Sequence, residues 1–261
     1  MPYCDNHGVR LHYEVLGKGP PLFLHVGAGL EWDFWKLAGY PRRLEGYRLV
    51  INDPRGRGES DRPHTLAAHR MESYVSDVLL ILDDLGINQA GFWGHSDGAR
   101  VGFVLALKHP DRVKALVAAG GQDEPGEFKK WRLSLAKIAR TQGAGPLNKL
   151  AREAYRSEFG RDYPKWYRTR RRVRDPEVFA LNMLAWRDWI ERWDMYPKIK
   201  APTLVISGEK EDPARLADKI AALMPNARSV VIEGENHLGE FLRSDLSLSH
   251  VKPFLEKYLH G

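Results

Sequence analysis

Cysteine is almost absent from this sequence, which limits the ways in which the fold can be stabilised. Cys4 is the one cysteine among 261 residues, so no disulfide can form within the chain. No histidine or cysteine cluster has the spacing of metal ligands, and we expect no metal and no cofactor. Folding must therefore depend on a hydrophobic core, which a chain of this length can readily bury.

Long apolar runs are absent as well. No uninterrupted stretch approaches the roughly 20 residues that cross a bilayer, and the first ten residues lack the apolar centre of a signal peptide. We therefore expect a cytoplasmic protein with no membrane partner.

Excess charge is confined to one segment. The formal net charge is +6, and residues 165–174 (KWYRTRRRVR) hold six basic residues and no acidic one. The rest of the chain is therefore neutral overall, whereas a nucleic-acid-binding domain usually spreads positive charge over a whole face. We expect a small-molecule ligand, no nucleic acid, and a monomer or homodimer.

What the sequence does contain is an alternation of short β-like and helical segments. Several of the β-like segments are nearly continuous runs of Val, Leu and Ile, as in parallel strands buried on both faces. The alternation predicts an α/β fold with a mostly parallel central sheet covered by helices on both faces. The expected strands begin at Leu11, Pro21, Tyr47, Ala90, Val113, Ala201 and Ala227.

The alternation stops between Gln122 and Lys200, where helical patterns occur without a convincing strand. We interpret residues 1–121 and 201–261 as the α/β core and residues 122–200 as an inserted all-helical lid. Ligands bind at the carboxyl edge of open α/β sheets, so an insertion there would form a wall of the pocket.

A candidate nucleophile lies between the strand that begins at Ala90 and the helix that follows it. The segment Gly94-His95-Ser96-Asp97-Gly98 has the G-x-S-x-G pattern in the strand–turn–helix setting that this pattern requires. Glycines at both ends permit a very tight turn that projects the serine hydroxyl. Ser96 is therefore the predicted nucleophile.

With these features, the sequence resembles the α/β-hydrolase superfamily over nearly its whole length. PLFLHVGAG, beginning at Pro21, is similar to the oxyanion segment of that family, and DPRGRGESDRP, beginning at Asp53, is similar to its D-x-R-G-x-G-x-S turn. The resemblance implies an oxyanion hole formed by the backbone N–H groups of Gly27 and Asp97. Val26 stands where the family usually has glycine, so it is the alternative donor to Gly27.

A serine hydroxyl needs an adjacent base, and His237 in GENHLGEFL is the predicted one. It follows the last expected strand, where the family places its histidine, and the other nine histidines are less suitably placed. The resemblance puts the acid after the preceding strand, within GEKEDP. We prefer Asp212, with Glu211 as the alternative and Asp123 in reserve, and we expect Glu209 to be solvated.

These residues predict a serine hydrolase that cleaves a small to medium apolar carboxylic ester or lactone through an acyl-enzyme. A serine nucleophile disfavours epoxide opening through an aspartyl ester. The alternatives are a carbon–carbon bond hydrolase acting on vinylogous diketones and a hydrolase-fold ligand receptor with slow turnover. Substrate contacts are expected from Trp32, Trp35, Trp131 and Trp186, although aromatic residues at helical spacing usually build core.

Overall fold

The structure is a computed structural model that describes residues 2–121, 126–159, 173–187, 193–210 and 215–260. No helix in these ranges is long and apolar enough to cross a membrane.

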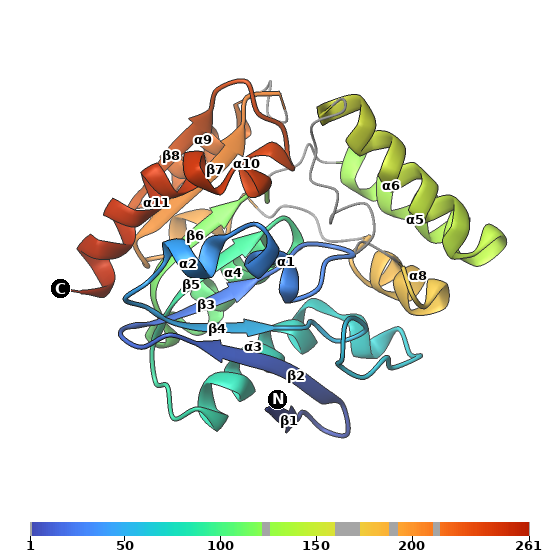
Figure 1. Ribbon diagram of the computed structural model, residues 1–261, viewed down its shortest axis with the longest axis horizontal. Helices are drawn as coiled ribbons and strands as arrows, with labels where there is room; N and C mark the ends of the chain where they lie inside the picture. The colour runs from blue at the N-terminus through green and yellow to red at the C-terminus, as the bar shows by residue number, and fades with distance from the viewer. Residues whose placement is uncertain (1, 122–125, 160–172, 188–192, 211–214, 261) are drawn as a thin grey trace.

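Eight strands in the described ranges form one sheet in the order β1-β2-β4-β3-β5-β6-β7-β8 (Figure 1). The pairs β1/β2 and β2/β4 are antiparallel, and every other neighbouring pair is parallel. All seven expected strands are present; the short β1 was not expected. The strands are β1 Tyr3–Asp5, β2 Arg10–Leu16, β3 Pro21–His25, β4 Arg48–Asn52, β5 Ala90–His95, β6 Val113–Ala119, β7 Thr203–Gly208 and β8 Ala227–Ile232.

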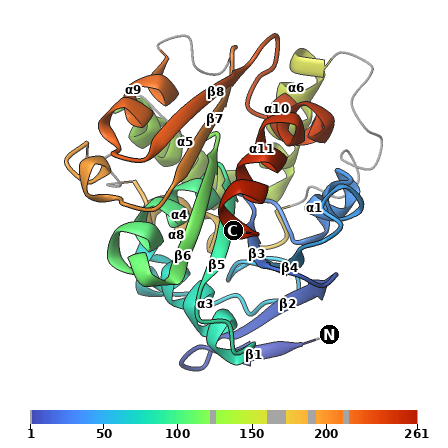
Figure 2. The same ribbon diagram turned by 90° about the vertical axis from the view of Figure 1, so that its left-hand side faces the viewer.

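Helices cover both faces of the sheet, as Figure 2 shows from the side. On one face lie α3 (Met71–Asp84), α4 (Asp97–Lys108) and α9 (Leu216–Leu223). On the other lie α1 (Asp33–Leu37), α2 (Tyr40–Arg43), α10 (Gly239–Leu242) and α11 (Ser244–Leu259). Short 3-10 turns, η1 (Ala67–His69), η2 (Pro110–Arg112) and η3 (Tyr196–Lys198), complete the described connections.

The two faces of the sheet have separate hydrophobic cores because side chains alternate along each strand. In β5, Phe92 packs in the core under α3, α4 and α9, whereas its neighbour Trp93 packs in the core under α1, α2 and α11. Leu116 and Val117 divide in the same way in β6. Strands buried on both faces must therefore be apolar throughout.

One helix has a proline in its interior. α11 begins at Ser244 and continues through Pro253 to Leu259. Proline in a helix interior removes one hydrogen bond and is unfavourable by itself. Buried residues before and after it, including Val251 and Phe254, pack the helix against the sheet and offset that cost.

The described residues between β6 and β7 form helices and no strand. They include α5 (Glu127–Gln142), α6 (Ala144–Phe159) and α8 (Pro176–Ala185), which lie together beside the sheet in Figure 1. A small core of their own joins them, formed by Ala136, Ala139, Leu147, Ala180 and Met183. Asp175 caps α8 by accepting a hydrogen bond from the Val178 backbone N–H at 3.0 Å. The lid role and the boundaries of the insertion stay predictions.

Candidate active site

The predicted nucleophile lies in a tight turn between β5 and α4. Ser96 has φ 56° and ψ −119°, a backbone conformation that non-glycine residues seldom adopt. A Cβ added at Gly94 would lie 2.1 Å from the Gly98 carbonyl oxygen, and one at Gly98 would lie 2.3 Å from the His25 carbonyl oxygen. Both glycines are therefore required by close backbone approach, as the sequence pattern indicated.

The segment after β3 lies directly against this turn. A Cβ added at Gly27 would lie 2.6 Å from the Ser96 Cβ and 3.2 Å from its Oγ. Asp97 begins α4, so its backbone N–H belongs to the first turn, where such groups have no partner within the helix. The two residues expected to supply the oxyanion donors thus both lie next to the serine.

His25 supports the loop that carries Gly27. Its Nδ1 lies 3.0 Å from the Val26 carbonyl oxygen, which can only accept a hydrogen bond, so Nδ1 carries the proton. Burial lowers the pKa of His25 to about 4, which keeps the ring neutral near pH 7. The alternative oxyanion donor Val26 is fully buried.

His237 reaches the same edge of the sheet from the loop after β8. The Asn236 Oδ1 accepts hydrogen bonds from the N–H groups of Leu238 and Gly239 at 3.0 and 2.9 Å, which fixes the turn around His237. The His95 and His237 rings are 4.7 Å apart, and His95 Nε2 donates to the His237 carbonyl oxygen at 3.0 Å. The fold therefore brings His237 beside the residue that precedes Ser96.

A buried carboxylate that the sequence reasoning missed lies beside the two histidines. Glu240 is 2% exposed, and its Oε1 is 3.5 Å from His95 Nε2. Ligand-type atoms of His95, His237 and Glu240 all lie within 4.8 Å of one another. The group resembles a metal-ligand set, but His95 Nε2 faces a carbonyl oxygen and so carries a proton, which favours a hydrogen-bonding role. An acid one helical turn after His237 was the signal available in the sequence.

The predicted acid, Asp212, and its alternative, Glu211, lie outside the described residues, as does Asp123. The chain leading to them is described up to residue 210. Lys210 N–H donates to the Glu235 carbonyl oxygen at 2.9 Å, which joins the loop after β7 to the loop that carries His237. Glu209 is exposed, as expected.

Arginines surround the side chain of Asp97, the residue after the nucleophile. Arg132 Nη2 from α5 lies 2.8 and 2.9 Å from the two carboxylate oxygens, and Arg100 Nη1 lies 3.3 Å from Oδ1. Burial opposes ionisation of Asp97, but Arg132, Arg100 and Arg57 hold the pKa of its carboxyl below the ordinary value. Burial also lowers the pKa of Arg132 to about 10. This ion pair attaches the helical insertion to the turn that carries Ser96.

Arg57 connects that turn with the loop that carries Gly27, which we call the oxyanion loop. Its Nη1 donates to the Gly27 carbonyl oxygen at 2.6 Å, and its Nη2 lies 3.9 Å from Asp97 Oδ2. The D-x-R-G-x-G-x-S segment therefore does more than form a structural turn, because it places a cation between the residues expected to supply the oxyanion hole.

The four tryptophans expected in the pocket occupy different environments. Trp35 and Trp186 are 0% and 2% exposed and pack in the cores, so the structure differs from the prediction that they line a pocket. The Trp186 indole N–H donates to the His69 carbonyl oxygen at 2.8 Å, which explains its inward position. Trp131 is 47% exposed and Trp32 is half-buried, and substrate contact by either stays a prediction.

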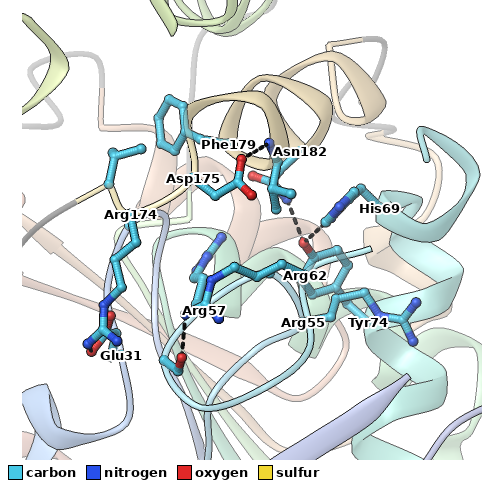
Figure 3. A pocket seen from close by; sticks show the side chains of 15 residues that line it. Glu31, Arg55, Arg57, Arg62, His69, Tyr74, Arg174, Asp175, Phe179 and Asn182 are labelled. Atoms are coloured by element: carbon cyan, nitrogen blue, oxygen red, sulfur yellow. Dashed lines mark hydrogen bonds and ion pairs between the residues drawn. The ribbon is translucent and has the colours of Figure 1, made fainter. Parts of the chain in front are cut away.

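A cavity lies beside the oxyanion loop, between the D-x-R-G-x-G-x-S segment and α8 (Figure 3). Its volume is about 30 Å³, enough for a few water-sized groups. Its lining is both polar and apolar and includes Gly29, Arg57, Arg62, Tyr74, Phe179 and Asn182.

The sequence pattern of the α/β hydrolase fold family matches residues 20–243. The chain belongs to this family. The chain is 38% identical to epoxide hydrolase 2 of Siraitia grosvenorii over 114 residues, which are 43% of this chain and 36% of that protein. It is 33% identical to bifunctional epoxide hydrolase 2 of Sus scrofa over 42% of this chain and 20% of that protein. These matches span about a third or less of those relatives.

Solved structures match the chain over nearly its whole length. The enol-lactonase of Burkholderia xenovorans has a TM-score of 0.83 and 28% identity, with 97% of this chain and 99% of that chain covered. A hydrolase of Pseudomonas aeruginosa has a TM-score of 0.85 and 26% identity, with 97% of each chain covered. These likenesses agree with the α/β-hydrolase fold of the present chain.

Proposed function

We propose that the protein is a serine hydrolase that cleaves a small to medium carboxylic ester or lactone. The observation that carries this proposal is the setting of Ser96, which has a strained backbone and lies against Gly27 at the carboxyl edge of the sheet. A strained serine at the start of a helix, with backbone donors close by, is the arrangement that acyl transfer requires.

In the proposed reaction, the Ser96 hydroxyl oxygen forms a bond to the carbonyl carbon and His237 takes the hydroxyl proton. The N–H groups of Gly27 and Asp97 stabilise the negative oxygen of the tetrahedral intermediate. The alcohol leaves with the proton from His237, and water then hydrolyses the acyl-enzyme. Asp212, or Glu211 in its place, orients the imidazole.

The names of the relatives suggest more than one substrate class. Epoxide hydrolases and an enol-lactonase both match this chain. We favour ester or lactone cleavage because Ser96 offers a hydroxyl, whereas epoxide opening through an aspartyl ester needs a carboxylate nucleophile. We also propose that the part of the acyl group nearest the reacting carbonyl is apolar.

Chromogenic aryl esters of increasing acyl length test this function. We expect turnover that is best for short to medium chains and is reduced to background in Ser96→Ala, while the thermal midpoint of that variant is retained. No activity on any ester or lactone in a folded protein, or an undiminished rate in Ser96→Ala, would overturn the proposal.

A further inference from the structure

The cavity beside the oxyanion loop has more positive than negative charge available to a ligand. Arg57 and Arg62 both line it. Arg62 Nη2 donates to the Gly58 carbonyl oxygen, and Arg57 Nη1 donates to the Gly27 carbonyl oxygen. Among the described residues, no carboxylate oxygen approaches Arg62 within ion-pair distance, and the Asp97 oxygen is 3.9 Å from Arg57. Two guanidinium groups therefore retain donors for an anion.

The acidic groups in and behind the wall already have polar partners of their own. Asp175 Oδ2 lies 3.0 Å from His64 Nε2, and Glu31 Oε2 lies 2.9 Å from Arg174 Nη2. The buried carboxylate of Asp77 pairs with Arg55, another arginine of the cavity, whose Nε is 2.7 Å away. These pairings leave Arg57 and Arg62 as the cations that can bind an incoming negative group.

Asn182, in the cavity wall, has a side-chain oxygen that acts as a hydrogen-bond acceptor. This role follows from a chain of hydrogen bonds that begins at His69 (Figure 3). His69 Nε2 is 2.8 Å from the Pro63 carbonyl oxygen, so Nε2 carries the proton. Burial lowers the pKa of His69 to about 4, so the ring is neutral near pH 7 and its Nδ1 is an acceptor. The Tyr74 hydroxyl lies 3.2 Å from that Nδ1 and donates to it.

Because the Tyr74 proton is used in this way, the Tyr74 oxygen accepts from the Asn182 amide, whose Nδ2 is 2.7 Å away. The Asn182 Oδ1 is then fixed as an acceptor, and Asn182 forms part of the cavity wall. Asn182 is 4% exposed, and its Oδ1 has no hydrogen-bond partner among the described residues. A buried acceptor without a donor favours a ligand that supplies an O–H or N–H group.

The position of the cavity connects it with the proposed reaction. Gly29, two residues after the expected oxyanion donor Gly27, forms part of its wall, and Arg57 contacts both the cavity and the Gly27 carbonyl. We propose that the cavity is an acyl-side subsite that binds a carboxylate of the substrate through Arg62 and Arg57. Asn182 accepts a hydrogen bond from a hydroxyl or N–H group on the same acyl chain. This inference rests on the proposed ester or lactone hydrolysis and names its substrate class as half-esters or lactones of dicarboxylic acids.

Matched aryl esters test the carboxylate preference. The mono-4-nitrophenyl ester of glutaric acid and 4-nitrophenyl pentanoate differ in charge at the far end of the acyl chain. We expect kcat/KM to favour the glutarate ester at least tenfold, and Arg62→Gln to reduce the ratio of the two values about 10- to 100-fold, the worth of a charge-assisted hydrogen bond. Arg62→Lys should retain most of the preference. The control Arg42→Gln, on exposed surface of α2, should leave the ratio unchanged.

The 3-hydroxyglutarate mono-ester tests the acceptor. Asn182→Leu should reduce the kcat/KM of the hydroxylated ester relative to the glutarate ester about tenfold. Equal kcat/KM for the charged and neutral esters in the wild type, or an Arg62→Gln ratio equal to that of the wild type, would overturn the subsite.

Failure of the subsite can be distinguished from failure of the proposed function. If the neutral ester is hydrolysed in a Ser96-dependent manner without any carboxylate preference, the function stands and the subsite is wrong. If no ester is hydrolysed, the function is wrong, and titration calorimetry with glutarate then decides the subsite. Glutarate binding that Arg62→Gln weakens, with glutaramide as the uncharged control, would support an anion site, and absence of glutarate binding would refute it.

Discussion

Substituting Gly27→Ala should separate catalysis from folding. The backbone of Gly27 does not have positive φ, so alanine can adopt its conformation and the effect of the substitution is purely steric. The new Cβ would lie 2.6 Å from the Ser96 Cβ, whereas ordinary contacts begin at 3.4 Å. The loop and the serine must therefore separate by about 0.8 Å, the difference between these two distances.

Such a shift is large compared with the tolerance of an oxyanion hole. Its donors act at about 2.7–3.1 Å from the developing oxyanion, and losing one donor reduces kcat about 10²- to 10³-fold. We expect Gly27→Ala to reduce kcat by this factor and to change KM much less, because the lost interaction forms mainly in the transition state.

Aryl-ester kinetics and the rate of labelling by a fluorophosphonate measure this effect, and thermal unfolding checks that the variant folds. Gly145→Ala in α6 is the matched control, because its added Cβ meets nothing within 4 Å. If a folded Gly27→Ala protein keeps kcat within about threefold of the wild type, the assignment of Gly27 to the oxyanion hole is wrong.

Three further predictions concern stability. Arg132→Met removes the shortest contacts of Asp97 but leaves its other arginines, so urea unfolding should show a loss of about 1–3 kcal/mol; an unchanged stability would show that α5 is not held by this pair. Trp186→Phe leaves the His69 carbonyl without its indole donor and should cost about 1–3 kcal/mol with kcat unchanged; a selective loss of kcat would restore Trp186 to the pocket. His25 and His69 have folded-state pKa values of about 4, below the 6.5 of the unfolded chain. Their contribution to the free energy of unfolding is therefore complete above pH 6.5 and is lost as pH falls toward 4. As pH falls through that window, each histidine should lower the free energy of unfolding by about 1.4 kcal/mol per pH unit. His69→Gln should therefore reduce the slope of the free energy of unfolding against pH. A free energy of unfolding that does not change with pH would contradict the burial of these histidines as neutral rings.

The sequence was sufficient to predict seven of the eight described strands and the tight turn that carries Ser96. The strands of the parallel region could be found because burial on both faces makes them continuously apolar, as in β5 and β6. The turn around Ser96 could be predicted because close backbone approach requires glycine at both Gly94 and Gly98. These features are local, and local steric requirements leave a direct trace in the sequence.

The contacts made across the fold were harder to predict. Arg132 follows Phe128 by four residues, so it lies on the apolar face of α5, but its partner Asp97 is 35 residues away along the chain. His95, which contacts Glu240, and Tyr74, which binds Asn182, likewise come from distant segments. A charged or amide residue on an otherwise apolar helical face indicates a buried polar contact without naming its partner.

The central claim is that Ser96 is the reactive nucleophile, and a fluorophosphonate tests it most directly. Mass spectrometry of the labelled protein should find one adduct, on the peptide that contains Ser96, and Ser96→Ala should take up no label and hydrolyse no ester. Label on a different residue, or ester turnover that survives Ser96→Ala, would contradict the account.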